Sequence, residues 1–124
     1  MFGGFDSAKE YGTFHEQRVA NMLGLQTVRG SGCSKWNDRK GDAKDEEFVL
    51  EHKATTKNSF SVSQKHLMKI FNQANASTPH TPLFGITFSE MPRPYQLDYI
   101  VMRINDFIAM KEELEQLRAQ YLGL

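Results

Sequence analysis

The sequence predicts a single α/β domain over residues 1–124, with a mixed central β-sheet flanked by helices. Its length of 124 residues is typical of one domain. Stretches with helical periodicity alternate with short apolar stretches, in the order helix, strand, hairpin, helix, strand, strand, helix. Hydrophobic residues make up 40% and charged residues 24%, which is typical of a globular protein and argues against a disordered chain.

The first predicted helix spans residues 10–23, and a short strand over residues 25–29 follows it. Gly24 is placed to end the helix, because glycine adopts the left-handed conformation of a helix C-cap. Two glycines in the loop at 30–34 permit close approach of a ligand. The apolar stripe of the helix consists of Val19, Met22 and Leu23, with Tyr11 and His15 at its start.

Residues 42–53 are predicted to form a β-hairpin, with its turn near residues 44–46. Side chains alternate between the two faces of a strand. In the second strand, residues 47–53, one face should therefore present Phe48, Leu50 and His52, and the other Val49, Glu51 and Lys53.

A second helix is predicted after Ser61, which has capping-box spacing to Gln64. Its apolar stripe is Leu67, Ile70, Phe71 and Ala74. Residues 78–82 should end it, and strands are expected at 83–89 and 97–104, joined by a connector at 91–94.

Asn105 or Asp106 is expected to cap a last helix. Its apolar residues recur at alternating spacings of three and four, which fits packing onto its own sheet or a seam between two protomers. They are Phe107, Met110, Leu114, Leu117 and Tyr121.

Charge is unevenly distributed, although 15 Lys and Arg balance 15 Asp and Glu. Residues 41–51 contain five acids, whereas residues 52–89 contain none and residues 25–40 contain only one. An acidic segment between two basic ones suits an enzyme that holds a metal ion and binds phosphates. Solvated charged faces would give the same pattern. Candidate phosphate-binding residues are Lys35, Arg39, Lys40, Lys57, Lys65 and Lys69, and Trp36 is a candidate for stacking on a base.

Three residues of the hairpin form a candidate metal site. Glu51 and Lys53 point to the same face of one strand, and folding of the hairpin can bring Asp42 beside Glu51. Two adjacent carboxylates favour a divalent cation, and oxygen ligands favour Mg²⁺ or Mn²⁺. The backbone carbonyl of His52 offers a further oxygen ligand. Glu16, beside the apolar face of the first helix, needs a polar partner and is a candidate to join the site.

This pattern resembles the PD-(D/E)XK nuclease superfamily, and most closely its archaeal- and phage-type Holliday junction resolvases. The resemblance covers roughly residues 10–90. It rests on Glu16 in a helix, a Gly-Ser-Gly loop at 30–32, Gly41-Asp42, Glu51-His52-Lys53, and Ser63-Gln64-Lys65 at the start of a helix.

The resemblance implies a restriction-endonuclease-like core and a homodimer that cuts branched DNA with Mg²⁺. Asp42 and Glu51 would bind the metal, Lys53 would be catalytic, and Glu16 would assist the metal directly or through water. Arg29 and Ser31 would contact DNA from the Gly-Ser-Gly loop. The near-neutral charge departs from the usually basic resolvases, and bears on the preference for branched DNA more than on nuclease chemistry.

Two alternatives remain open at this point. One is a nuclease of the same fold that acts on duplex DNA or DNA ends without junction preference. The other is a non-catalytic DNA-binding protein.

The single cysteine, Cys33, excludes an internal disulfide and a multi-cysteine zinc site. With no apolar run long enough to span a bilayer and no signal-peptide pattern, we expect no membrane partner and a cytoplasmic location in a prokaryotic or phage-infected cell.

Overall fold

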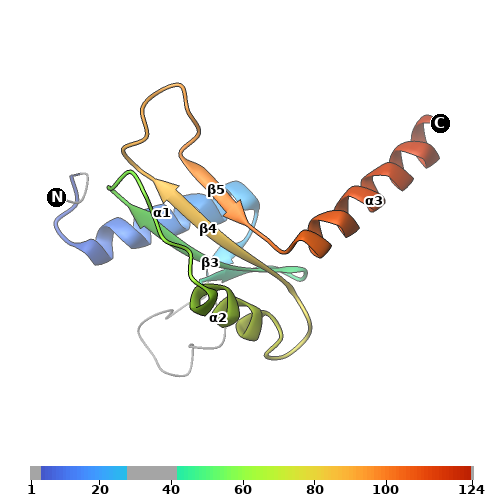
Figure 1. Ribbon diagram of the computed structural model, residues 1–124, viewed down its shortest axis with the longest axis horizontal. Coiled ribbons are helices and arrows are strands. Elements are labelled where there is room, and N and C mark those ends of the chain that lie inside the picture. The colour runs from blue at the N-terminus through green and yellow to red at the C-terminus, as the bar shows by residue number, and fades with distance from the viewer. Residues whose placement is uncertain (1–3, 28–41, 124) are drawn as a thin grey trace.

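The computed structural model describes residues 4–27 and 42–123 and shows a five-stranded mixed sheet with helices (Figure 1). The strands lie in chain order, and only β3 and β4 are parallel. This confirms the predicted α/β class and element order. The elements are α1 (Ala8–Leu23), β1 (Gln26–Thr27), β2 (Ala43–Lys44), β3 (Phe48–Thr55), α2 (Gln64–Ala74), β4 (Thr81–Phe88), β5 (Asp98–Val101) and α3 (Ile104–Leu122).

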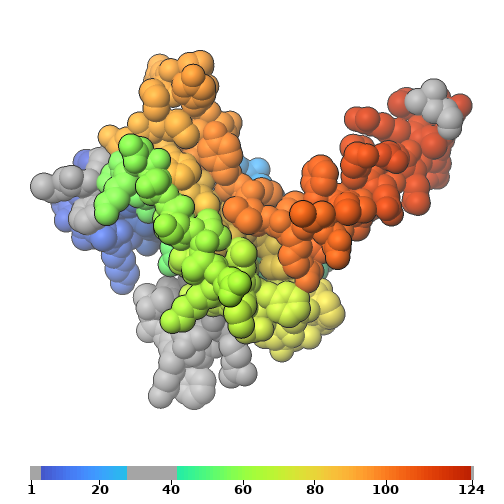
Figure 2. Space-filling model, in the orientation of Figure 1, coloured from blue at the N-terminus to red at the C-terminus, as the bar shows by residue number. Residues whose placement is uncertain are grey.

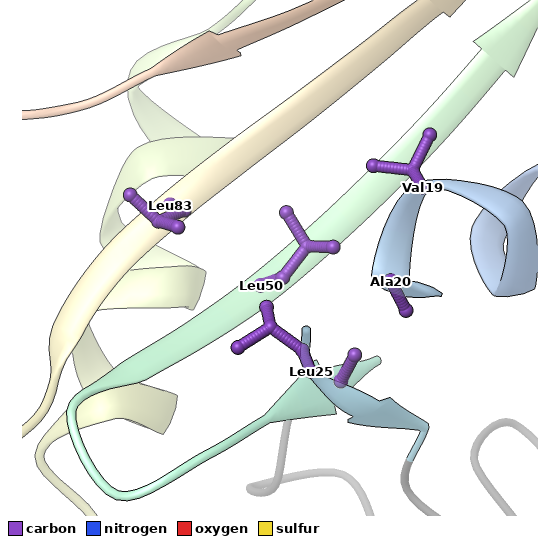
Figure 3. Close-up of a cluster of buried hydrophobic side chains, with 6 residues drawn as sticks. Val19, Ala20, Leu25, Leu50 and Leu83 are labelled. Carbon is purple, nitrogen blue, oxygen red and sulfur yellow. The ribbon is translucent and has the colours of Figure 1, made fainter. Parts of the chain in front are cut away.

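Helices α1 and α2 cover opposite faces of the sheet, because neighbouring residues of β3 point in opposite directions. Leu50 packs with Val19 and Ala20 of α1 (Figure 3), whereas Val49 packs with Ile70 and Ala74 of α2. The predicted alternation of faces along β3 is thus confirmed. Because β3 is buried on both faces, it provides a rigid base for its polar residues Glu51 and His52.

Gly85 of β4 allows its neighbours to pack closely. A Cβ atom at this position would lie 3.1 Å from Leu50 Cδ1 and 3.2 Å from His52 Cδ2. Glycine at position 85 therefore leaves room for the buried His52 ring beside it.

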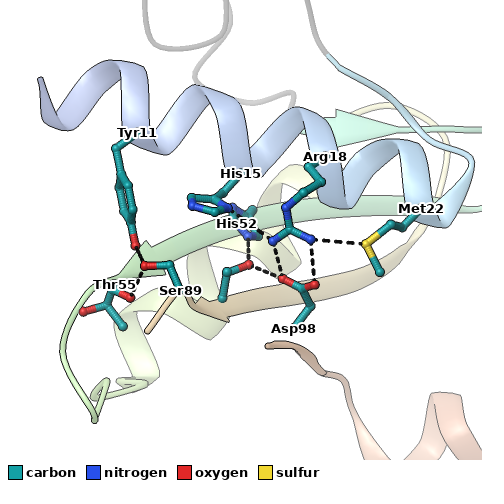
Figure 4. Close-up of polar contacts among 9 residues, drawn as sticks. Tyr11, His15, Arg18, Met22, His52, Thr55, Ser89 and Asp98 are labelled. Carbon is teal, nitrogen blue, oxygen red and sulfur yellow. Dashed lines mark hydrogen bonds and ion pairs between the residues drawn. The ribbon is translucent and has the colours of Figure 1, made fainter. Parts of the chain in front are cut away.

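The start and end of α1 follow the predicted signals, but part of its apolar stripe does not. Gly24 ends the helix with a left-handed φ of 73°. Met22 and Leu23 are exposed rather than buried. On this part of the helix, Arg18 and His15 face the sheet and make polar contacts instead (Figure 4).

Helix α2 begins later than its sequence predicts. Its N-cap is Ser63, not Ser61, and the Ser63 hydroxyl accepts a hydrogen bond from the N–H of His66. The His66 ring completes the capping box from the third helical position. Gln64 is therefore the first helical residue and not a capping partner.

Helix α3 differs most from expectation. Its N-cap is Arg103 without a side-chain cap, so neither Asn105 nor Asp106 caps it; Asp106 instead accepts hydrogen bonds from the Arg103 side chain. None of its residues is buried, and the helix projects away from the sheet (Figure 1). The expectation that it packs onto its own sheet is wrong. No helix in the described part of the chain is long and apolar enough to cross a membrane.

Candidate active site

The site begins where β2 and β3 separate. Strand β2 pairs with β3 only at Val49 and Leu50, and Asp42 lies immediately before β2. The backbone N–H of Asp42 donates to the Leu50 carbonyl at 2.8 Å, and the Asp42 carboxylate accepts a 2.7 Å bond from the N–H of His52. Beyond Leu50, the Asp42 side chain takes the place of a neighbouring strand by accepting the hydrogen bond from the backbone of β3. These two bonds fix the position of Asp42.

Glu51 meets Asp42 at this position. It is 4% exposed and interacts electrostatically with Asp42. The pKa of Glu51 is raised to about 7, chiefly by burial and then by the charge of Asp42. A raised pKa of this kind is expected where a carboxyl group is buried next to another of the same charge.

Two lysines flank Glu51. Its carboxylate oxygens lie 3.6 Å from Lys69 Nζ and 3.9 Å from Lys53 Nζ, and both ammonium groups lower its pKa. Lys53 lies on the same strand, as predicted. Lys69 comes from α2, and the sequence indicated only a phosphate-binding role for it. Nothing in the sequence around Lys69 indicated that its side chain would reach Glu51.

Glu16 approaches the same group of side chains from α1. The pKa of its half-buried carboxyl is raised to about 7, first by burial and then by the charges of Asp42 and Glu51, while Lys53 lowers it. Coupling to all three predicted residues supports placing Glu16 in the site.

A hollow of about 440 Å³ opens beside these residues. Glu16 and Asp42 supply its acidic groups, and Lys9, Lys53 and Lys57 supply its cations. The predicted phosphate-binding residue Lys57 is thus at the site, and Lys9, which the sequence did not single out, joins it. Acidic groups beside cations are the combination that a metal-dependent reaction on a phosphate requires.

The His52 ring lies between α1 and the sheet, in a network of polar contacts (Figure 4). Its Nε2 lies 2.8 Å from the Thr87 hydroxyl, which donates to Asp98 at 2.7 Å. Asp98 in turn accepts two hydrogen bonds from Arg18, at 2.7 and 2.8 Å. Burial lowers the pKa of His52 to about 4, so its ring is neutral at pH 7. His52 is buried on the strand face predicted for Phe48 and Leu50, and His15 is buried in the same network through its contact with Arg18.

Several predicted residues lie elsewhere. Lys65 is exposed on the first turn of α2 and does not line the hollow. Cys33 and Trp36, and the Gly-Ser-Gly loop, are outside the described residues. So are the predicted DNA-binding residues Arg29, Ser31, Lys35, Arg39 and Lys40.

The donors suit a small hard cation such as Mg²⁺ or Mn²⁺. Asp42 and Glu51 interact electrostatically, and a dication between them would offset the repulsion of their charges. Within residues 4–27 and 42–123, no three His, Cys, Asp or Glu side chains converge as a ready-made metal site. Asp42 and Glu51 are the residues that would hold such an ion.

Comparisons with known proteins assign no family to this chain. No protein-family model matches it, and no curated protein matches it.

Proposed function

We propose that this protein is a Mg²⁺-dependent endonuclease that hydrolyses phosphodiester bonds in branched DNA, in the manner of a Holliday junction resolvase. The observation that carries the proposal is the placement of Asp42 next to the buried Glu51, with Lys53 Nζ 3.9 Å from the Glu51 carboxylate and Glu16 electrostatically coupled to all three. Burial of Glu51 next to a second acid costs stability, and a catalytic site explains why they are together.

Each residue has a role in this proposal. Asp42 and Glu51, with the backbone carbonyl of His52, would hold the ion, which when bound polarises a phosphate and lowers the pKa of a bound water. Lys53 would stabilise negative charge that develops on the phosphate. Glu16 would orient a water molecule in the hollow through its carboxylate.

The cations around the hollow support a nucleic-acid substrate. Lys9, Lys53 and Lys57 line the hollow together with Glu16 and Asp42, and lysine contacts with phosphates supply most of the affinity for DNA. The preference for branched DNA, and for two such sites acting as a homodimer, rests on the resemblance of the sequence to the resolvases.

Cleavage of an end-labelled four-way junction, compared with a linear duplex of the same sequence, tests the proposal. We expect Mg²⁺-dependent cutting of the junction that EDTA abolishes and that Asp42→Asn, Glu51→Gln and Lys53→Ala each abolish. Lys44→Ala, an exposed change on β2, is the matched control and should cut normally. Equal cutting of duplex and junction would replace junction specificity with general nuclease activity. DNA binding without Mg²⁺-dependent cutting would show a non-catalytic protein and overturn the proposal.

A further inference from the structure

Helix α3 presents a continuous apolar stripe that the rest of the described residues leave uncovered. The stripe residues are 42–75% exposed, and Figure 2 shows α3 standing clear of the rest of the molecule. Most of the stability of a helix in a protein comes from packing of its apolar face. The stripe consists of Phe107, Met110, Leu114, Leu117 and Tyr121.

The spacing of the stripe is that of a coiled coil. Its residues alternate at intervals of three and four, which places Phe107, Leu114 and Tyr121 at a positions and Met110 and Leu117 at d positions of a heptad. A narrow stripe of this kind fits one facing helix better than a broad sheet surface.

The charges beside the stripe specify what the facing helix must be. The g positions carry Asp106 and Glu113, and the e positions carry Lys111 and Arg118. In a parallel pair, each g residue meets the e residue five positions later in the partner. Two copies of α3 in parallel therefore place acid opposite base at every such contact.

An antiparallel pair would do the opposite. There g faces g and e faces e, so acids would meet acids and bases would meet bases. Within the described residues, Glu113 and Arg118 have no ion-pair partner in their own chain, whereas Asp106 already pairs with Arg103 at 2.7 Å. The contacts between Glu113 and Arg118 therefore carry the argument. Lys111 pairs with Glu115 at 3.1 Å, but both side chains are more than 60% exposed, so this pair adds little.

From these observations we infer that α3 is a dimerisation helix that pairs in parallel with α3 of a second copy of this chain. The two-fold axis runs along the helix pair, so both sheets lie at its N-terminal end. An apolar groove lined by Leu67, Phe71, Val101 and Met102 opens at the start of α3 and adds apolar surface near this axis. The inference does not depend on the proposed nuclease activity.

Charge reversal tests both the pairing and its direction. Sedimentation equilibrium of the full chain should show a dimer. Glu113→Arg should raise the dimer dissociation constant by roughly tenfold, because two attractive contacts become repulsive. The double variant Glu113→Arg with Arg118→Glu should restore it. Glu112→Arg, on the outer face of the helix, is the matched control and should leave it unchanged.

A crosslink fixes the register independently. With Cys33 replaced by serine, Leu117→Cys should form an oxidised dimer, since equivalent d residues face each other in a parallel pair. Glu112→Cys should not. A monomer at high micromolar concentration, a stronger dimer for Glu113→Arg, or failure of Leu117→Cys to crosslink would each overturn the inference. DNA cleavage is read separately, so loss of the dimer is not confused with loss of the proposed activity.

Discussion

Asp42 lies next to the buried Glu51 at the point where β2 and β3 separate, and its charge helps to raise the pKa of Glu51. The backbone holds Asp42 there through the N–H of His52, and burial holds Glu51. The two groups cannot move apart easily when both are ionised. The free protein therefore stores repulsion that protonation, mutation or a cation can relieve.

Glu51→Gln should stabilise the metal-free protein at about pH 8, by roughly 2 kcal/mol of unfolding free energy. The folded-state pKa of Glu51, about 7, lies above its ordinary value of 4.5. The folded form therefore loses stability as pH rises from 4.5 to about 7, and Gln carries no such charge. Urea unfolding in EDTA at the two ends of this range measures the effect. The exposed acid Glu47, changed to Gln, should show none. A destabilised Glu51→Gln at the higher pH would contradict the burial account.

Mg²⁺ should bind more tightly as pH rises through about 7. The raised pKa values of Glu16 and Glu51 mean that protons compete with the cation below this pH. Calorimetric titration in buffers of different ionisation enthalpy measures both affinity and released protons. Affinity independent of pH between about 6 and 8 would show that these carboxyl groups do not hold the ion.

Lys57→Ala should weaken DNA binding and reduce its salt dependence. Lys57 lines the hollow, so losing one phosphate contact should lower the slope of log affinity against log salt by about 1. Fluorescence anisotropy over a range of salt concentrations gives this slope. An unchanged slope for Lys57→Ala, or the same loss for Lys44→Ala, would place the DNA elsewhere.

Asp98→Asn should destabilise the fold by about 2 kcal/mol, because it leaves the Arg18 guanidinium and the buried Thr87 hydroxyl without their charged acceptor. Although burial acts to raise the pKa of Asp98, hydrogen bonds from Arg18 and Thr87 hold it below its usual value. This contribution is present above the unfolded pKa of 3.8 and is lost as pH falls below it. Thermal unfolding measures the stability of Asp98→Asn against that of Glu115→Gln, which removes only an exposed ion pair. Equal stability of the two variants would count against the network.

Local sequence patterns predicted the helices and strands of this fold. Contacts between residues far apart in the sequence could not be predicted in this way. Gly24 and the alternation along β3 depend only on neighbouring residues, so the first helix and the hairpin were predicted from the sequence. The Arg18–Asp98 pair joins residues 80 positions apart, and no local pattern indicates it. Lys69 reaches Glu51 only because α2 packs on that face of β3. The apolar stripe of α3 was visible, but a stripe does not say whether its partner lies in the same chain.

His52 contributes its backbone and its ring to different partners. Its amide holds Asp42 at the hollow, while its imidazole is fixed by Thr87 on the α1 face of the sheet. Pre-organisation of the first proposed ligand thus begins with the packing of this ring against β4. The Thr87 hydroxyl, which does not line the hollow, can therefore determine how well this protein captures an ion.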